Sequence, residues 1–224
     1  AWALKQVDPR CMRQQFTVVG GRIVRELNGI SCLAIEDVED LKKSIQVTRS
    51  FGKPITNFYD LKAAIATYAT RLGEKLRRQD LFTQNISLFI RTNKHRPNGP
   101  QYSNSATVVL QKPINDGISL IKAASIALQQ IYINGYAYSK AGIMAHELKP
   151  KGQNIQLDLF SNKFEEPLQS PELWEAIDNL NKRYGKGTLF SAACGKSLSW
   201  KDKKNLLSPS YTTCWDQLAI AFAR

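Results

Sequence analysis

Two kinds of hydrophobic periodicity occupy the middle of the chain. Apolar and polar residues alternate in four stretches, which predicts half-buried strands at residues 45–48, 86–91, 105–110 and 141–145. Two further stretches carry apolar residues three or four positions apart, which predicts helices. We expect the first helix to run from a cap at Asn57 to about Arg78. The second is expected to run from a cap at Asn115 or Asp116 to about Ile131.

This order, β-α-β-β-α-β, predicts an α+β domain at residues 46–150, in which two helices cover one face of a four-stranded antiparallel sheet. We expect Gly52-Lys53-Pro54 to end the first strand. The other face of the sheet is expected to be uncovered. It would carry mostly short polar or basic side chains, namely Gln46, Thr48, Ser87, Phe89, Arg91, Ser105, Thr107 and Lys140. Such a face suits a phosphate backbone, although a merely solvated face is the alternative.

The segments on either side of this domain have different residue patterns. Residues 1–16 have the pattern of the end of a helix, and residues 17–45 that of a connector with an Asn28-Gly29 turn and an acidic patch. Because Ala1 stands inside a helical pattern, we expect the chain to be part of a longer protein. Residues 151–169 form a polar tether around an apolar cluster, and residues 170–224 form a mainly helical extension with a helix at 171–184.

The net charge of +12 is concentrated in the central domain. Residues 46–150 carry fourteen basic and five acidic side chains, a net of +9, whereas residues 1–45 and 151–224 carry nets of +1 and +2. A positive field confined to one domain favours a polyanion such as nucleic acid, but charge alone leaves a merely basic domain equally open.

Other chemistry is not indicated. The four cysteines form no CxxC pair, and the two histidines have no neighbouring nucleophile pattern, so we expect no metal site and no catalytic residues. No apolar run reaches the roughly 18 residues of a membrane helix, and no charged and apolar leader opens the chain. We therefore expect no membrane partner and a cytoplasmic protein, which nucleic-acid binding would associate with the nucleoid.

Nine short motifs, taken in order, resemble the C-terminal part of UmuC-type Y-family translesion DNA polymerases. They lie at residues 24–32, 48–52, 74–77, 89–93, 102–106, 138–142, 156–160, 184–188 and 208–213. The resemblance implies the end of the thumb at residues 1–45, the DNA-gripping little finger at 46–150 and the UmuC-specific extension at 170–224. The chain departs from the family at Gly20-Gly21, which predicts a looser exit from the thumb, and at Ser210, which replaces an Arg.

The resemblance also implies binding residues. DNA contacts are expected at Lys43, Ser44, Thr48, Arg49, Ser50, Arg91, Thr92, Asn93, Ser103, Asn104, Ser105 and Lys140. A sliding clamp is expected to bind the pentapeptide Gln156, Leu157, Asp158, Leu159 and Phe160, unless these residues cap the chain's own core. Tyr211 and Trp215 would contact a UmuD′-type subunit or the recombinase filament, unless they pack on the helix at 171–184.

Three readings of function compete. The first is a DNA- and clamp-binding part of an error-prone polymerase of the SOS response. In that reading the magnesium-binding carboxylates of the palm lie outside these residues, so this segment holds no cofactor and does not polymerise DNA alone. The second is a standalone truncated regulator that competes for DNA or clamp. The third, an unrelated RNA- or protein-binding module, is weakened because Phe89 is the only good stacking platform on the uncovered face.

Overall fold

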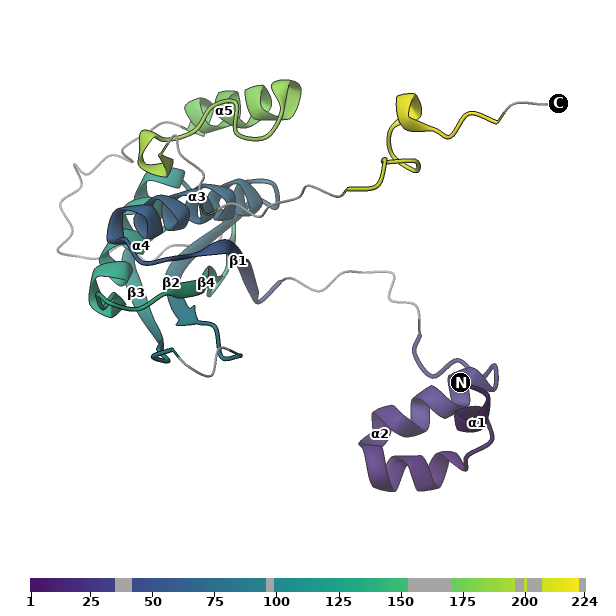
Figure 1. Ribbon diagram of the computed structural model, residues 1–224. Coiled ribbons are helices and arrows are strands. Elements are labelled where there is room, and N and C mark those ends of the chain that lie inside the picture. Colours follow the sequence, from purple (N-terminus) through teal and green to yellow (C-terminus); the bar gives the residue numbers. More distant parts are fainter. Residues whose placement is uncertain (35–41, 96–98, 153–170, 196–199, 201–206, 222–224) are drawn as a thin grey trace. The chain divides into compact units, whose positions relative to one another are not determined.

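The computed structural model describes residues 1–34, 42–95, 99–152, 171–195, 200 and 207–221 (Figure 1). The chain divides into two compact units, Ala1–Leu41 and Lys42–Arg224. Among the described helices, none has the length and apolar character needed to cross a bilayer.

In the first unit, helical structure continues past residue 16, where the sequence predicts that it ends. After α1 (Trp2–Lys5), α2 (Pro9–Leu27) begins at the Asp8 cap and continues past a kink at Phe16 and Thr17. The connector prediction for residues 17–27 is therefore wrong, although the Asn28-Gly29 turn is confirmed by the positive φ of Gly29.

Gly20-Gly21, expected to loosen this region, instead permits close packing within it. Both glycines are buried, and a Cβ at Gly20 would lie 2.7 Å from Cβ of Phe16. The half of α2 that follows the kink thus packs on the half that precedes it, and only a residue without a side chain fits there.

The second unit is built on the predicted sheet. Strands β1 (Ser44–Ile55), β2 (Leu81–Thr92), β3 (Ser103–Ile114) and β4 (Tyr138–His146) are all paired antiparallel, in the spatial order β1-β4-β2-β3. The two-residue strand β5 (Lys149–Pro150) adds to the start of β2. The predicted β-α-β-β-α-β fold is therefore confirmed, with one short strand added.

One predicted break is wrong, because β1 does not end at Gly52. Its pairing with β4 is regular up to Ser50, is interrupted, and resumes at Ile55 opposite Tyr138. Residues 51–54 therefore bulge out of the ladder, which is how a strand tolerates a glycine and a proline at the edge of a sheet.

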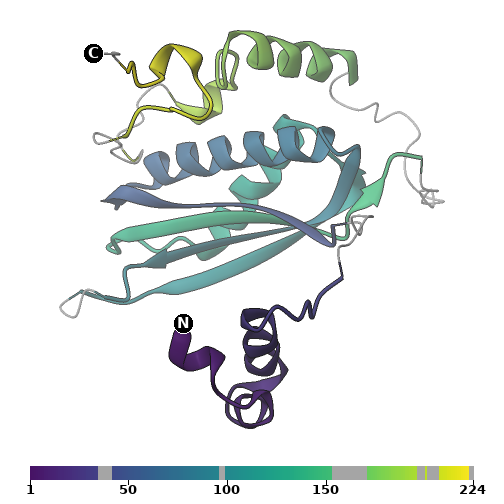
Figure 2. The same ribbon diagram turned by 90° about the vertical axis from the view of Figure 1, so that its right-hand side faces the viewer.

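Helices α3 (Phe58–Arg77) and α4 (Gly117–Ile131) cover one face of the sheet, as predicted (Figures 1 and 2). Their caps are Asn57, which accepts from the amide of Tyr59, and Asp116, which accepts from the amide of Ser119. The apolar stripe of α3 is fully buried, and the strands contribute every second residue to the same core, including Ile86, Leu88, Ile90, Ile143 and Ala145.

The C-terminal extension divides into two differently packed parts. Helix α5 (Pro171–Tyr184) and the short 3-10 helix η1 (Ala192–Cys194) lie on the side of α3 that faces away from the sheet (Figure 2). The second part contains the 3-10 helix η2 (Trp215–Gln217), where the Trp215 side chain is 87% exposed. The predicted helix at 171–184 is confirmed.

Candidate nucleic-acid interface

The uncovered face of the sheet is a grid of four rows with four residues each. The pairing register places one residue of each main strand in every row, because alternate residues of a strand point to the same side. Read from β1 through β4 and β2 to β3, the rows are Ser44-His146-Asn85-Val109, Gln46-Met144-Ser87-Thr107, Thr48-Gly142-Phe89-Ser105 and Ser50-Lys140-Arg91-Ser103. All eight residues predicted for this face are present.

Carboxylates are absent from this grid, and its charge is concentrated in the fourth row. Arg91 and Lys140 stand directly opposite each other on neighbouring strands, between the hydroxyls of Ser50 and Ser103. Two like charges at opposed positions of a sheet are destabilising when nothing compensates them. A phosphate placed between them would remove that repulsion. The hydroxyls of Ser50 and Ser103, one strand further out on either side, could bind neighbouring phosphates.

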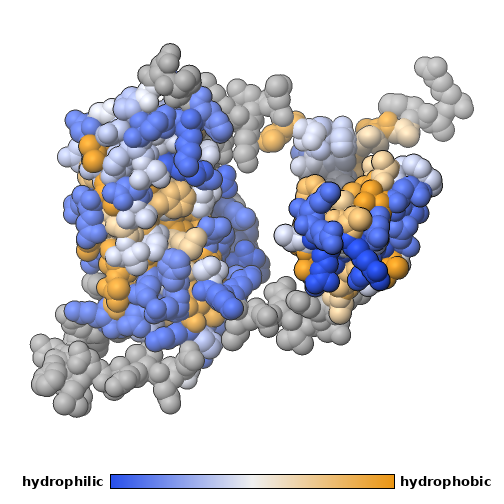
Figure 3. Space-filling model, turned by 90° about the horizontal axis from the view of Figure 1, so that it is seen from below, coloured by the Kyte–Doolittle hydropathy of each residue, from blue (hydrophilic) through white to orange (hydrophobic). Residues whose placement is uncertain are grey.

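The third row has no side chain at Gly142, and the Phe89 ring lies over this position. A Cβ on Gly142 would lie 2.5 Å from Cε1 of Phe89 and 2.6 Å from Oγ1 of Thr48. The Phe89 ring therefore occupies the space that a side chain at position 142 would fill, and its neighbours in the row are a hydroxyl on each side. Seen from below (Figure 3), this face of the larger unit shows an apolar strip among hydrophilic residues.

A chain of hydrogen bonds links the first row to the second, and the sequence did not predict it. Nε2 of His146 lies 3.0 Å from Oγ of Ser87, which lies 2.8 Å from Oγ1 of Thr107. The sequence contained a clue, because His146 continues the alternation of Lys140, Gly142 and Met144. The contact to Ser87, fifty-nine residues away in sequence, depends on the register of β2 with β4.

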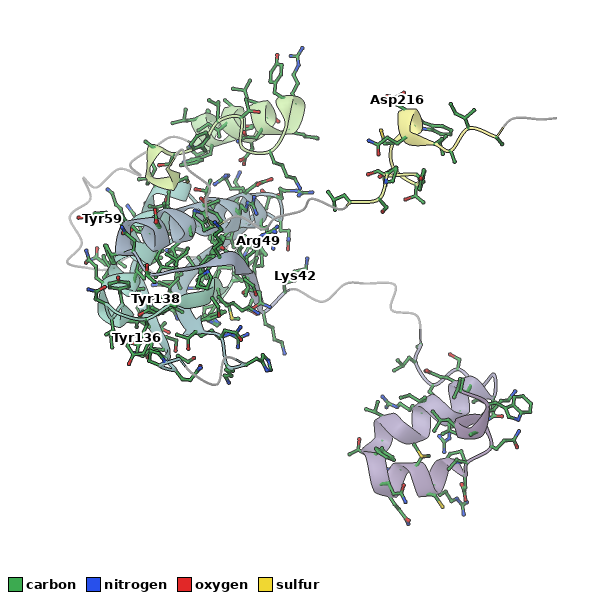
Figure 4. All side chains as sticks on the ribbon, in the orientation of Figure 1. Lys42, Arg49, Tyr59, Tyr136, Tyr138 and Asp216 are labelled. Atoms are coloured by element: carbon green, nitrogen blue, oxygen red, sulfur yellow. The ribbon has the colours of Figure 1, made fainter. Side chains whose placement is uncertain are left out.

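Basic side chains also line an open hollow where β1 begins and α3 ends, next to the first row. Its lining comprises Lys42, Ser44, Ile45, Lys75, Arg78 and Gln79. The Lys75 ammonium donates to the carbonyl of Gln46 over 3.0 Å, which holds it at the edge of β1. Figure 4 shows Lys42 at the start of this strand. Sequence reasoning missed these cations, because they come together only through packing of α3 on β1.

The predicted DNA-contact residues do not all lie on the grid. Seven do, namely Ser44, Thr48, Ser50, Arg91, Ser103, Ser105 and Lys140. Lys43 and Asn93 are exposed beside it, and Asn93 accepts from the amide of His95 in the hairpin between β2 and β3.

Three of the predicted contact residues lie elsewhere. Arg49 (Figure 4) and Asn104 are opposite Ala141 and Ile90, so the register places them on the helix-covered side of the sheet. Thr92 is buried, and its hydroxyl donates to Oε1 of Gln101 over 2.9 Å. A role for Thr92 in closing the hairpin follows directly from these contacts.

Of the remaining predicted sites, some lie outside the described residues and some lie within them. The pentapeptide Gln156–Phe160 lies outside the described residues, as does the acidic patch at 36–40. Tyr211 and Trp215 are described, with side chains that are 49% and 87% exposed. In the described parts of the chain, no three His, Cys, Asp or Glu side chains come together as a metal site requires. The described residues therefore do not fit a magnesium site.

Two family models match the chain. Residues 42–159 match the model of the impB/mucB/samB family C-terminal domain, and residues 171–221 match a domain of unknown function, DUF4113. Among curated proteins, Protein UmuC of Salmonella typhimurium is 39% identical over 92% of this chain and 49% of its own length. Protein MucB of Escherichia coli is 38% identical over 97% of this chain and 51% of its own length.

More distant relatives are also found. DNA polymerase IV of Clostridium acetobutylicum is 21% identical over 84% of this chain and 45% of its own length. The chain thus spans about half the length of the curated relatives it matches.

Proposed function

The chain belongs to the impB/mucB/samB family, and from this premise we propose that it is the DNA-binding C-terminal part of a UmuC-type translesion DNA polymerase. Relatives named UmuC, MucB and DNA polymerase IV support this proposal. In it, the chain holds DNA during damage tolerance in the SOS response, in the cytoplasm and at the nucleoid. Any magnesium belongs to the catalytic part of the enzyme, and this segment needs no cofactor.

The observation that carries the proposal is the fourth row of the grid. Arg91 and Lys140 face solvent side by side without a carboxylate in any row, so the charge is uncompensated by the face itself. The row also offers the hydroxyls of Ser50 and Ser103. This arrangement fits phosphate oxygens and carries no means of reading base identity, as a polymerase that must move along any sequence requires. The hollow with Lys42, Lys75 and Arg78 would extend the same phosphate path around the edge of β1.

Salt-dependent binding of duplex and primer–template DNA tests this assignment. Replacing Arg91 and Lys140 together by Ala should weaken binding roughly tenfold at low salt, equally for unrelated sequences, and should reduce the slope of log K against log salt by about 2. The matched control is Lys122→Ala with Lys62→Ala, which removes the same charge from the helical layer and should leave the slope nearly unchanged. Equal slopes in all three proteins would refute the assignment.

The variant Arg49→Ala gives a second test of the same assignment. Because the register places Arg49 on the side of β1 opposite to Thr48 and Ser50, Arg49→Ala should affect binding less than Arg91→Ala does. A larger loss for Arg49→Ala would mean that DNA follows the edge of β1 and not the uncovered face.

We also propose that Gln156–Phe160 docks on the bacterial sliding clamp. The sequence supports this, because Gln156 can donate and accept while Leu159 and Phe160 offer apolar surface. Both flanks of this segment are held by the same unit. The amide of Lys151 donates to the carbonyl of Asp80, and Asp178 of α5 is paired with Arg77. The described residues before and after this segment are thus both attached to α3 and its C-terminal turn.

Replacing Leu159 and Phe160 by Ala should abolish binding to a purified sliding clamp, measured by surface plasmon resonance, and leave the melting temperature nearly unchanged. Asn162→Ala with Lys163→Ala, in the same segment, is the control and should bind as the parent does. A large fall in melting temperature would instead assign the apolar cluster to the chain's own core.

Tyr211 and Trp215 support a further contact with a UmuD′-type subunit or a recombinase filament. Their exposure is the supporting observation, because large amphipathic side chains are typical anchors of protein interfaces. Trp215→Ala should weaken co-purification with such a subunit while leaving DNA affinity unchanged. Unaltered co-purification would remove Trp215 from the interface.

A further inference from the structure

The first half of the extension is fixed to the helical layer by a clasp around Arg77. Its guanidinium makes two bonds to the Asp178 carboxylate, Nε to Oδ2 over 2.6 Å and Nη2 to Oδ1 over 2.8 Å, and donates from Nη1 to the carbonyl of Asn115. The Trp174 ring lies against the guanidinium at 4.7 Å. This clasp joins α3, the start of α4 and α5 through one side chain.

Two close approaches complete the docking. A Cβ at Gly117 would lie 2.9 Å from the Trp174 ring, so the first residue of α4 must be small for Trp174 to be buried there. Further along, Cys194 is buried with its Sγ 3.6 Å from the Thr70 hydroxyl of α3. The extension therefore follows α3 along its outer side.

Trp200 makes a separate contact with strand β1. Trp200 is 6% exposed and meets Phe51 and Tyr68 edge to face, with ring centroids 6.3 and 5.8 Å apart. Its carbonyl accepts from the amide of Gly52 over 3.2 Å. Residues 51–54 are the part of β1 that leaves the ladder with β4, so Trp200 supplies a partner where the neighbouring strand supplies none.

We infer that Trp200 is a positioning residue for DNA binding, and that the first half of the extension serves to hold strand β1 in its DNA-contacting form. This inference rests on the proposed function of the uncovered face. Ser50, in the fourth row, immediately precedes Phe51, which stacks on Tyr68 and meets Trp200. Without the Trp200 ring, the backbone carbonyl of residue 200 would no longer be held against the amide of Gly52, and Phe51 would lose one aromatic neighbour. Ser50 would then no longer be held beside Lys140 and Arg91.

The test compares Trp200 with another aromatic residue of the same extension, in the whole chain. Trp200→Ala removes the ring that anchors the carbonyl of residue 200 at Gly52, so it should weaken DNA binding about fivefold, as releasing roughly one hydrogen bond would. The salt slope should not change, because no cation is removed. Amide hydrogen exchange at Gly52 should accelerate in the same variant. Trp200→Phe should restore both properties in large part, because it retains an aromatic ring against Phe51 and Tyr68. Phe190→Ala, which removes a half-exposed ring from the same extension, is the matched control and should change neither.

The outcomes separate this inference from the proposed function. If Trp200→Ala binds DNA like the parent while Arg91→Ala with Lys140→Ala binds weakly, the inference about Trp200 is overturned and the DNA-binding face stands. If the charge variant also binds like the parent, the proposed function itself fails. Should Trp200→Ala be unfolded by circular dichroism, Trp200→Leu takes its place, and full DNA affinity in that folded variant would equally overturn the inference.

Discussion

The two faces of the sheet are built from the same four strands, but one forms the core and the other is exposed to solvent. On one face, every second residue is apolar and buried under α3 and α4, with Leu88, Ile90 and Ile143 at 0% exposure. On the other face, the alternate residues are mostly hydroxyls, amides and two cations in one row. The comparison teaches that stability is concentrated on the first face, which leaves the second free to carry uncompensated charge for a ligand.

The largest expected effect lies on the covered face. Leu88→Ala removes a fully buried side chain, so the free energy of unfolding should fall by about 2–5 kcal/mol, measured by urea denaturation. Ser105→Ala, one strand away on the uncovered face, should stay within about 0.5 kcal/mol of the parent. Comparable losses in the two variants would show that both faces contribute to the core.

Gly142 is the position where the uncovered face does depend on packing. Gly142→Val places a side chain where the Phe89 ring lies, so we expect a loss of about 1–3 kcal/mol in unfolding free energy. Removing the obstacle in the double variant Gly142→Val with Phe89→Ala should recover part of that loss. No recovery in this double-mutant cycle would mean that Phe89 is not the side chain that excludes a Cβ.

The smallest expected effect concerns Tyr138, the first residue of β4. Its hydroxyl donates to the carbonyl of Ile133 and accepts from the amide of the same residue, so Tyr138→Phe should cost about 1 kcal/mol near neutral pH. Burial raises the pKa of the Tyr138 phenol above its usual value of 10.0. The stabilisation is therefore complete below that usual value and is lost as pH rises through the higher pKa of the folded chain.

Denaturation of the parent and of Tyr138→Phe at several alkaline pH values measures this difference. The parent should lose its advantage over the variant as the phenol ionises. An advantage that is constant with pH would show that Tyr138 does not ionise before the chain unfolds.

The sequence alone determined which residues share a side of each strand and where most helices begin. Alternation is a property of a single strand and capping a property of one turn, so Ile86, Leu88 and Ile90, or Asn57 and Asp116, could be assigned without knowing any distant neighbour. The same alternation places Arg49 on the opposite side of the strand from Thr48 and Ser50. The family motif at residues 48–52 groups the three residues in sequence and does not distinguish the two sides.

Only the tertiary structure decided which residues meet across the strands and what the extension does. The opposition of Arg91 and Lys140, the contact of His146 with Ser87 and the docking of Trp200 on Phe51 join residues 49 to 149 positions apart. Each depends on strand order and register, or on helices packing side by side. No local propensity encodes such pairings, because they arise from burying apolar surface of the whole unit at once.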